Sequence, residues 1–419
     1  MHQYRLSRLF IAVGLSVATS SALASPQSFM SSRSFAMGGA GVAIAHPASA
    51  TSANPAMMAA DQHDWADDFG LTLPSVNARA ADEEETIDQV DDIQDSIDQL
   101  DNAINSANPA DVQRHAGQLR EQLAAFDKDT VRANLGLGLA VAVPGKKIAV
   151  GVFSNGNLTA TVRGEYDERD DKILEDIEDG TVVIPPGQTV NLNSRGKVLA
   201  SAVVEAGLSF AHALKLNNGE TLQLGFSPKY VKLQTFQYTE TVSGFDDNDF
   251  DSDDSQTDKS GFNLDIGAAY AFGDEKQWNA GILVKNLIPM KLDSAASRRD
   301  LGEEVRTLKV GPMATVGIAH KSNYHIVTAE LDLTKKEAFG FEDDTQWLAL
   351  GAEFDAFRYA QLRAGVRYNL ASNDDNDGIA EETQFTAGLG VNLLGVRLDL
   401  GALFSDADMG ASLELGTAF

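Results

Sequence analysis

Long segments in which apolar and polar residues alternate constrain the fold of this chain more than any other feature. In one of them Leu135, Leu137, Leu139, Val141 and Val143 fall on one face, with glycine and alanine between them. A period of two places successive side chains on opposite faces of a β-strand. Many of these segments reach about 10 residues, enough to cross a bilayer at a tilt, whereas strands of soluble sandwiches usually have about 5 to 6. The pattern therefore predicts an all-β membrane protein.

Fourteen such segments follow one another along the chain, and the number is even. They are 69–80, 130–143, 146–165, 195–213, 219–243, 257–273, 277–287, 306–320, 323–334, 345–355, 359–370, 383–393, 396–405 and 410–419. The connections alternate between short turns, such as Pro144-Gly145, and long loops, such as 166–194. This alternation is typical of bacterial outer-membrane barrels, whose short turns face the periplasm. We therefore predict a 14-stranded antiparallel transmembrane β-barrel over residues 69–419, with both chain ends on the periplasmic side.

The first long loop, residues 81–129, has a helical rather than a strand-like pattern. Apolar residues recur every three or four positions from Ile87 to Ile104 and again from Val112 to Phe126. This spacing predicts a helical hairpin with one apolar seam in the first extracellular loop. The seam has two interpretations. Either it pairs the two helices with each other, or it offers an apolar molecule a first landing surface above the barrel.

The first 24 residues have the composition of a secretory signal peptide. Arg5 and Arg8 precede an apolar run from Leu9 to Val17, and Ala22-Leu23-Ala24 supplies the small residues that precede cleavage. The apolar run is shorter than the roughly 20 residues that a transmembrane helix needs, which argues against an anchor. We therefore predict that residues 1–24 are removed and that the mature chain is exported.

Between this leader and the first strand lies a segment that suits neither a long helix nor a strand. From Ser32 to Ala60 it interleaves glycine with alanine, and Asn54-Pro55 interrupts it near its end. A compact segment of small residues needs a cavity to occupy, and the lumen of the predicted barrel supplies one. We therefore predict that residues 25–68 form a plug, or hatch, inside the barrel. The hatch residues that we single out are Phe35, Met37, Gly38, Gly39, Gly41, Asn54, Pro55 and Ala56.

The polar face of the predicted strands carries charges of both signs. In a barrel this face lines the lumen, so we expect an ionic network that holds the strands and the plug together. The candidate lumen charges are Lys229, Lys285, Glu353, Arg363, Arg367, Arg397, Asp399 and Glu414. Fourteen strands leave a moderate bore that the plug would occupy, so we do not expect a wide open channel.

Composition and motifs argue against several classes of function. The formal charge of −28 is unsuited to nonspecific binding of nucleic acid, and the absence of cysteine excludes disulfide scaffolds and thiol chemistry. Neither an HExxH nor a G-x-S-x-G motif is present, so we predict no enzyme, no metal and no other cofactor. The acidic stretches 246–258 and 373–382 match calcium loops only in part, because Ser260 and Gln384 stand where a bidentate glutamate belongs. We interpret them as solvated acidic surface, with a calcium site as the alternative.

Three short motifs in the N-terminal segment make the chain similar to a known family. Phe35 to Ala43 reads FAMGGAGVA, Ala48 to Thr51 reads ASAT, and Asn54 to Ala56 reads NPA. Together with the fourteen predicted strands, they resemble the FadL family of outer-membrane transporters for hydrophobic compounds. Within that superfamily the chain is most similar to the branch labelled TraF-like, after a plasmid conjugal-transfer operon. That branch combines an AMGGAGVA hatch with a helical first loop.

The resemblance implies a location in the cell outer membrane. It also implies passive uptake of a hydrophobic small molecule, of long-chain fatty acid or hydrocarbon class, through the hatch-plugged lumen. The alternative is a TraF-like structural or assembly component of plasmid conjugal transfer. The expected partners are outer-membrane lipid and lipopolysaccharide, a hydrophobic small-molecule ligand, and the barrel-assembly machinery, which would read the terminal aromatic Phe419.

Overall fold

The computed structural model describes residues 29–60, 70–82, 86–143, 148–216, 220–244, 253–356, 359–373, 378–393 and 395–418. The predicted signal peptide, Phe419 and most of the acidic stretch 246–258 lie outside these residues, as do both ends of the predicted hatch, 25–28 and 61–68. The second acidic stretch is described except for residues 374–377.

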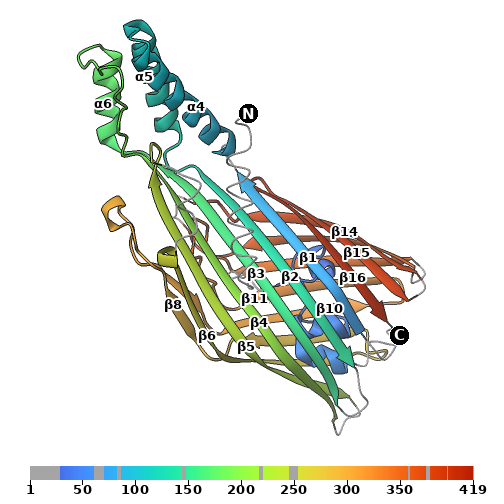
Figure 1. Cartoon of the computed structure of the whole chain (residues 1–419). Coiled ribbons are helices and arrows are strands. Elements are labelled where there is room, and N and C mark those ends of the chain that lie inside the picture. The colour runs from blue at the N-terminus through green and yellow to red at the C-terminus, as the bar shows by residue number, and fades with distance from the viewer. Residues whose placement is uncertain are drawn as a thin grey trace.

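Fourteen strands form one closed antiparallel barrel, as the sequence predicts, and the barrel closes where β1 pairs with β16 (Figure 1). The strands are β1 (Gly70–Asp82), β2 (Thr130–Val143), β3 (Ala149–Glu165), β4 (Arg195–Lys215), β5 (Thr221–Thr241), β6 (Gln256–Phe272), β7 (Trp278–Lys285), β10 (Met313–Lys321), β11 (His325–Asp332), β12 (Trp347–Ala356), β13 (Ala360–Asn369), β14 (Thr383–Leu393), β15 (Val396–Phe404) and β16 (Asp408–Ala418). Closure leaves no edge strand, so each strand pairs on both sides.

One predicted strand, residues 306–320, is divided in the structure at Gly311 and Pro312. Its first part, β9 (Thr307–Val310), pairs with β8 (Met290–Asp293) in a separate two-stranded sheet, and only β10 joins the barrel. Proline has no N–H group to donate to a strand ladder, which explains the break. The prediction of one continuous strand is therefore wrong here, although the number of barrel strands is correct.

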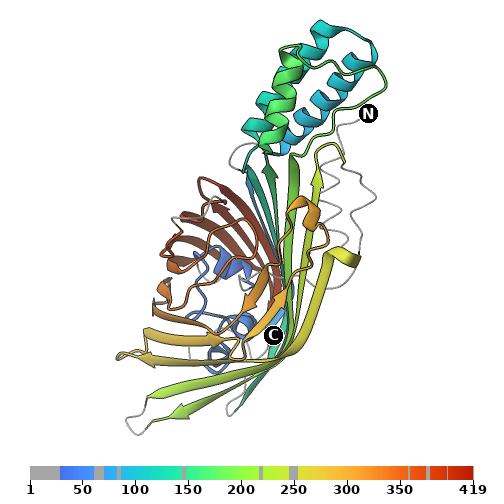
Figure 2. The ribbon, with the colours of Figure 1, turned by 90° about the vertical axis from the view of Figure 1, so that its left-hand side faces the viewer.

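The barrel wall is much taller on one side than on the other. Strands β1 to β6 contain 13 to 21 residues, whereas β7 and β10 to β16 contain 8 to 11. In Figures 1 and 2 the tall strands rise toward a group of helices at one end of the molecule. The wall is irregular in β1, where the register with both neighbours shifts between Thr72 and Ser75, next to Pro74.

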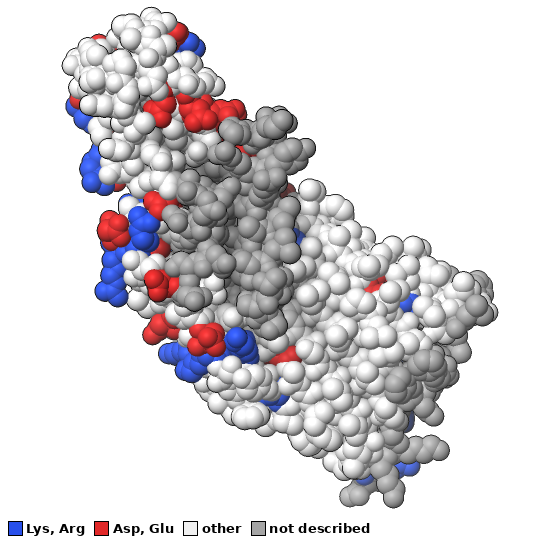
Figure 3. Space-filling model, in the orientation of Figure 1, with Lys and Arg blue, Asp and Glu red and all other residues white. Residues whose placement is uncertain are grey.

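The two faces of the strands differ as the alternation predicts. On β5, Leu224, Phe226 and Tyr230 point outward and are exposed, while Gln223, Ser227 and the other residues between them are buried toward the lumen. Large apolar side chains are exposed in the same way on the other strands of the barrel. In Figure 3 the surface over β14 to β16 carries few charged residues. The outside of the barrel is therefore mainly apolar and its inside mainly polar.

Three helices form a cluster beyond the tall wall. They are α4 (Thr86–Asn105) and α5 (Pro109–Ala125), which form the hairpin between β1 and β2, and α6 (Glu168–Glu178), which the sequence analysis did not anticipate. Arg120 of α5 forms ion pairs with Asp171 (2.7 Å) and Glu178 (3.0 Å) of α6. Among the described residues, none of the helices combines the length and the apolar character that crossing a membrane would require.

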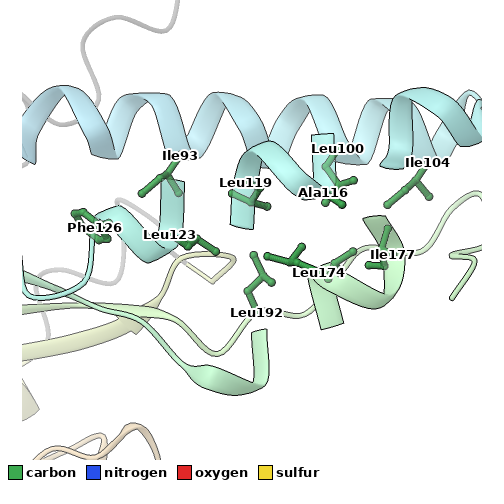
Figure 4. Close-up of a cluster of buried hydrophobic side chains, with 11 residues drawn as sticks. Ile93, Leu100, Ile104, Ala116, Leu119, Leu123, Phe126, Leu174, Ile177 and Leu192 are labelled. Atoms are coloured by element: carbon green, nitrogen blue, oxygen red, sulfur yellow. The ribbon is translucent and has the colours of Figure 1, made fainter. Parts of the chain in front are cut away.

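The apolar seam of the hairpin is buried within this cluster. Figure 4 shows Ile93 of α4, Leu119 of α5 and Leu174 of α6 directed toward one another. Each of these three side chains is at most 1% exposed. The seam therefore pairs the helices, and the alternative, an exposed landing surface for an apolar molecule, finds no support in the described residues.

The N-terminal segment lies inside the barrel, where Figure 1 shows it in dark blue. It contains the short helices α2 (Ser32–Phe35) and α3 (Pro47–Ala53) and the 3-10 helix η1 (Pro55–Ala59). Two further 3-10 helices, η3 (Asp253–Ser255) and η4 (Arg299–Leu301), belong to the loops. The N-terminal segment contacts strands on several sides of the barrel, because η1 packs against β3 to β6, α3 against β1 to β3, and α2 against β14 to β16 and β1.

Candidate functional site in the barrel lumen

Glycines on the strands give the N-terminal segment the room that it occupies. At Gly225, Gly281, Gly351 and Gly365, a Cβ atom would lie within 3.0 Å of the segment's backbone. Contacts this close leave no space for any side chain. We call these four inward-facing glycines the glycine belt. At the belt the backbone of the strands contacts the backbone of the N-terminal segment directly.

The predicted hatch residues lie where this contact is closest. Phe35, Met37, Asn54 and Ala56 are at most 1% exposed. Gly38 has a φ of 71° and its backbone lies against Val366 and Leu350, so both its conformation and its surroundings favour glycine. Of the remaining predicted residues, Gly39 lies in the same turn and also has a positive φ, of 89°, Gly41 follows this turn, and Pro55 begins η1.

The glycine-rich motif of the segment binds a carboxylate. The backbone N–H groups of Gly41, Val42 and Ala43 all donate to Oε1 of Glu330 on β11, at 2.9, 2.6 and 3.3 Å. Successive N–H groups that converge in this way form an anion-binding concavity. The Glu330 side chain is buried, and the motif therefore fixes the segment to the wall at this strand.

Asn54 fixes the other end of the segment. Its Nδ2 donates to the carbonyl oxygens of Val42 (2.8 Å) and of Ala268 on β6 (3.3 Å), and its Oδ1 accepts from the N–H of Ala56 (3.1 Å). On the neighbouring strand β7, Asn279 donates to the carbonyl of Ala43 at 2.6 Å. The NPA motif thus closes the segment on itself and binds it to the strands opposite β12 to β16.

Five of the eight predicted lumen charges form one buried network with the N-terminal segment. The network runs through Arg33, Glu353, Arg363, Asp399, Arg397 and Glu414, with successive N–O distances of 2.8, 2.6, 2.6, 2.7 and 3.2 Å. Glu414 also accepts from the N–H of Ser32 at 3.1 Å. Arg33 was missed in the sequence, where the only sign of its role is that it stands alone in an otherwise uncharged stretch.

The other three predicted lumen charges lie elsewhere. Lys229 binds Glu205 (2.7 Å) and Asp265 (2.8 Å), and Lys285 lies buried on β7. Arg367 donates to Gln384 at 2.7 Å, and its guanidinium stacks on the ring of Trp347 at 4.3 Å. Seven of the eight predicted charges are therefore buried and Arg397 is partly exposed, but the eight do not form a single network.

A second buried ion cluster was also missed. Arg132 on β2 binds Glu381 and Asp408 at 2.5 Å each, and Arg79 on β1 binds the same two carboxylates. Glu342 approaches Arg132 at 3.5 Å. Two of these acids, Glu342 and Glu381, lie in loops. Loop residues follow no periodic pattern that would indicate their partners, so residue spacing alone could not have identified this cluster.

Above the N-terminal segment the lumen is partly filled by loops. The β8–β9 hairpin packs on the inner face of β4 and β5, and Phe339 and Phe341 complete an apolar cluster there. Its members are Leu199, Val203, Val231, Leu233, Met290, Leu292, Leu308, Val310, Phe339 and Phe341. A cavity of about 250 Å³ lies next to Val203 and Met290, and one of about 120 Å³ is lined in part by Gly38 and Gly41. The lumen therefore has space for a small molecule between the N-terminal segment and the loops above it.

Comparison with solved structures shows what this architecture is similar to. A TodX monoaromatic hydrocarbon channel mutant matches with a TM-score of 0.55 and 13% identity, covering 94% of this chain and 99% of that one. The toluene transporter TodX of Pseudomonas putida matches with a TM-score of 0.50 and 11% identity, covering 94% and 98%. A FadL homologue of Pseudomonas aeruginosa matches with the same score and identity, covering 94% and 99%. At these identities the likeness shows the fold.

Sequence comparison adds the family. No curated protein matches the chain. The family model described as "F plasmid transfer operon, TraF, protein" matches residues 51–332, which is well over half of the chain and includes the NPA motif and the barrel strands from β1 to β11. The protein, a fourteen-stranded barrel of the kind found in FadL and TodX, is a member of this TraF family.

Proposed function

We propose that the protein is an outer-membrane barrel that admits hydrophobic small molecules passively, with residues 25–68 as its hatch. One observation carries the proposal: the N-terminal segment occupies the lumen and is bonded to strands on opposite sides of it, through Glu414 of β16 on one side and Asn279 of β7, half of the ring away, on the other. A filling of this kind closes the barrel to ions and water, so that passage requires the segment to shift.

The outer surface supports a membrane location. Near the short turns, the outward-facing rings of Tyr270, Phe272 and Trp278 follow one another across β6 and β7, with centroids 6.0 and 6.3 Å apart. Tyr230 and Phe262 form a second outward pair farther up, at 5.8 Å. Aromatic girdles flank the apolar band of outer-membrane barrels. The long loops would then face lipopolysaccharide, and the barrel-assembly machinery would insert the chain.

The interior supports an apolar cargo. The cavity of about 250 Å³ has an apolar part, formed by Val203, Met290, Val310 and Met313 among others, beside polar residues such as Glu205 and Lys309. Solved structures with this fold are named for monoaromatic hydrocarbons and toluene. We therefore propose the class of hydrocarbons and long-chain fatty acids, and a role as a channel rather than as an enzyme.

The test is uptake by cells. A deletion strain and a complemented strain would be supplied with labelled long-chain fatty acid and with labelled toluene. Because the chain has no cysteine, the double variant Ala48→Cys/Gly70→Cys can pin the segment to β1, since a Cβ at Gly70 would lie 3.3 Å from that of Ala48. We expect complementation to restore uptake, and the pinned variant to do so only under reducing conditions. Equal uptake by all strains would contradict the proposal.

A second candidate is a structural role in conjugal transfer, with the barrel as an anchor. The family description, which names a plasmid transfer operon, and the three-helix cluster that stands beyond the barrel favour it. Conjugation frequency of the deletion strain distinguishes the two. An unchanged frequency, with no envelope protein co-purifying with the barrel, would argue against the structural role.

A further inference from the structure

The loop between β11 and β12, residues 333–346, crosses the lumen. In the closed strand order β3 lies half of the ring away from β12, yet the tip of this loop reaches β3. The N–H of Phe341 donates to Oγ1 of Thr161 on β3 at 3.1 Å, and Gly340 packs against the same side chain. On the next strand, Arg132 of β2 contacts Glu342 at 3.5 Å. We call residues 339–342 the crossing tip.

A second loop holds the crossing tip in place. The N–H of Ile379 donates to the carbonyl of Phe341 (3.1 Å), and the N–H of Asp343 donates to the carbonyl of Ile379 (3.2 Å). The side chain of Asp343 also accepts from the N–H of Glu381 at 3.0 Å. These bonds form a short parallel bridge between the two loops, so the tip is fixed from above as well as at the opposite wall.

The crossing tip separates two unlike halves of the lumen. On one side Phe339 and Phe341 belong to the apolar cluster with the β8–β9 hairpin and the inner face of β4 and β5. On the other side Glu342 joins the buried ion cluster of Arg132, Glu381 and Asp408. A buried ion cluster is costly to open, because its guanidiniums and carboxylates would lose their partners. The apolar half is therefore the easier half for a neutral molecule to enter.

The apolar cluster lies between two cavities. An outer cavity of about 280 Å³ is lined by Leu199 and Phe341 among others. The inner cavity of about 250 Å³ is lined by Val203, Met290 and Val310. All five residues belong to the one apolar cluster. A molecule that moves from the outer cavity to the inner one on this side must therefore pass through apolar side chains.

We propose that the crossing tip is a second closure in series with the hatch and that its apolar half selects for apolar cargo. An apolar molecule exchanges water for apolar contacts when it enters the cluster, whereas a polar solute loses hydrogen bonds that the apolar side chains of the cluster do not replace. Arg163 and Arg306 lie over the Phe341 ring at 4.4 and 4.8 Å and define its resting position. The selectivity rests on the proposed function, whereas the closure itself does not.

The test measures ion conductance of the purified full-length protein in planar bilayers. Three variants are compared with the wild type: deletion of residues 35–56, the pair Phe339→Ala/Phe341→Ala, and their combination. Phe385→Ala/Phe404→Ala is the matched control, because both of these phenylalanines are exposed on the outer face. Heat modifiability on gels establishes that each variant is folded.

We expect each single change to leave conductance within about two-fold of wild type and the combination to raise it at least about ten-fold, because either of two seals in series suffices. Full conductance after the hatch deletion alone would overturn the second closure. If the combination stays closed although it is folded, both closures are wrong.

Selectivity is tested by uptake of toluene. Phe341→Leu keeps the apolar cluster, whereas Phe341→Gln buries an amide there, and we expect the glutamine variant to take up toluene about ten-fold more slowly than the leucine variant. Equal rates would overturn the selectivity. If the intact protein takes up no apolar probe but the combined variant conducts, then the proposed function and the selectivity fail while the second closure stands.

Discussion

The two fillings of the lumen are held by different forces. The N-terminal segment meets the wall through backbone atoms, a belt of glycines and directed bonds, such as those of Gly41 and Val42 to Glu330. The crossing tip meets it on the apolar side through the large side chains of Phe339 and Phe341. Backbone contact and hydrogen bonds require one register, whereas apolar side chains can repack around a guest. We therefore expect the N-terminal segment to shift as a unit, whereas the apolar side chains of the crossing tip rearrange locally.

The largest effect should come from removing the space for the segment. Gly365→Leu would direct a side chain into the backbone of Gly38, a clash that flexible neighbours cannot relieve, so the cost should exceed the ~3 kcal/mol usual for overpacking. We expect residues 31–45 to undock and lose protection from amide hydrogen exchange. Gly196→Leu is the control, since no atom of the described residues lies within 4 Å of a Cβ there. Retained protection in the first variant would mean that the belt does not position the segment.

A smaller effect should follow from breaking the buried ion pair of the segment. Arg33→Met removes one of the two arginines bound to Glu353, whose side chain is 4% exposed, and loss of one partner in a buried pair costs about 3 kcal/mol or more. We expect amides of residues 31–36 to exchange roughly 100-fold faster. Arg114→Met, at an exposed i,i+3 pair on α5, should change nothing measurable. A similar response to both variants would show that the pair does not hold the segment.

The glycine-rich motif should respond more weakly still. Glu330→Gln leaves an oxygen that can accept from Gly41 and Val42 but removes the charge, which should cost about 1 to 2 kcal/mol and speed exchange at residues 41–43 about ten-fold. Glu337→Gln serves as the control, because that carboxylate forms an exposed ion pair with Lys309. Unchanged exchange would mean that the motif does not depend on an anion.

The smallest effect concerns the crossing tip and pH. Burial raises the pKa of Glu342 to about 7, although Arg132 beside it acts in the opposite direction. A carboxyl whose pKa is raised on folding stabilises the folded state at low pH, and this contribution is lost as the pH rises through about 7. After correction for intrinsic exchange, the amide of Ile379, bonded to Phe341, should therefore be better protected at pH 6 than at pH 8. Glu342→Gln should abolish the difference, and its persistence in that variant would rule Glu342 out as its source.

The same contrast explains what the sequence could predict. Alternation is local, so fourteen strands and their faces could be predicted, and the FAMGGAGVA and NPA motifs identified the segment that enters the lumen. Their partners could not be identified, because Arg33 and Glu353 are 320 residues apart and only barrel closure brings them together. The inward glycines were visible on the polar face of the strands, but nothing local indicates which of them meets a backbone.

The crossing tip was even harder to predict from the sequence. Residues 333–346 read as an ordinary acidic loop, and its two phenylalanines have no periodic context. The break at Pro312 was missed although the proline itself is a local sign of it, because an alternating pattern continues on both sides. Residues that act through long-range contacts in irregular loops carry no local periodicity, and these are the residues that the sequence analysis missed.

The unequal height of the wall has a consequence for how the molecule is approached. Strands β1 to β6 are longer than the strands that face them, so the rim of the barrel is oblique (Figure 2). In the proposed orientation, a molecule in the outer leaflet reaches the low side of this rim first. The helical cluster lies beyond the tall side of the wall, away from this low side of the rim. Another surface structure could therefore bind the helical cluster without covering the low side of the rim. Attachment of a partner and entry of cargo would then use different surfaces of the molecule.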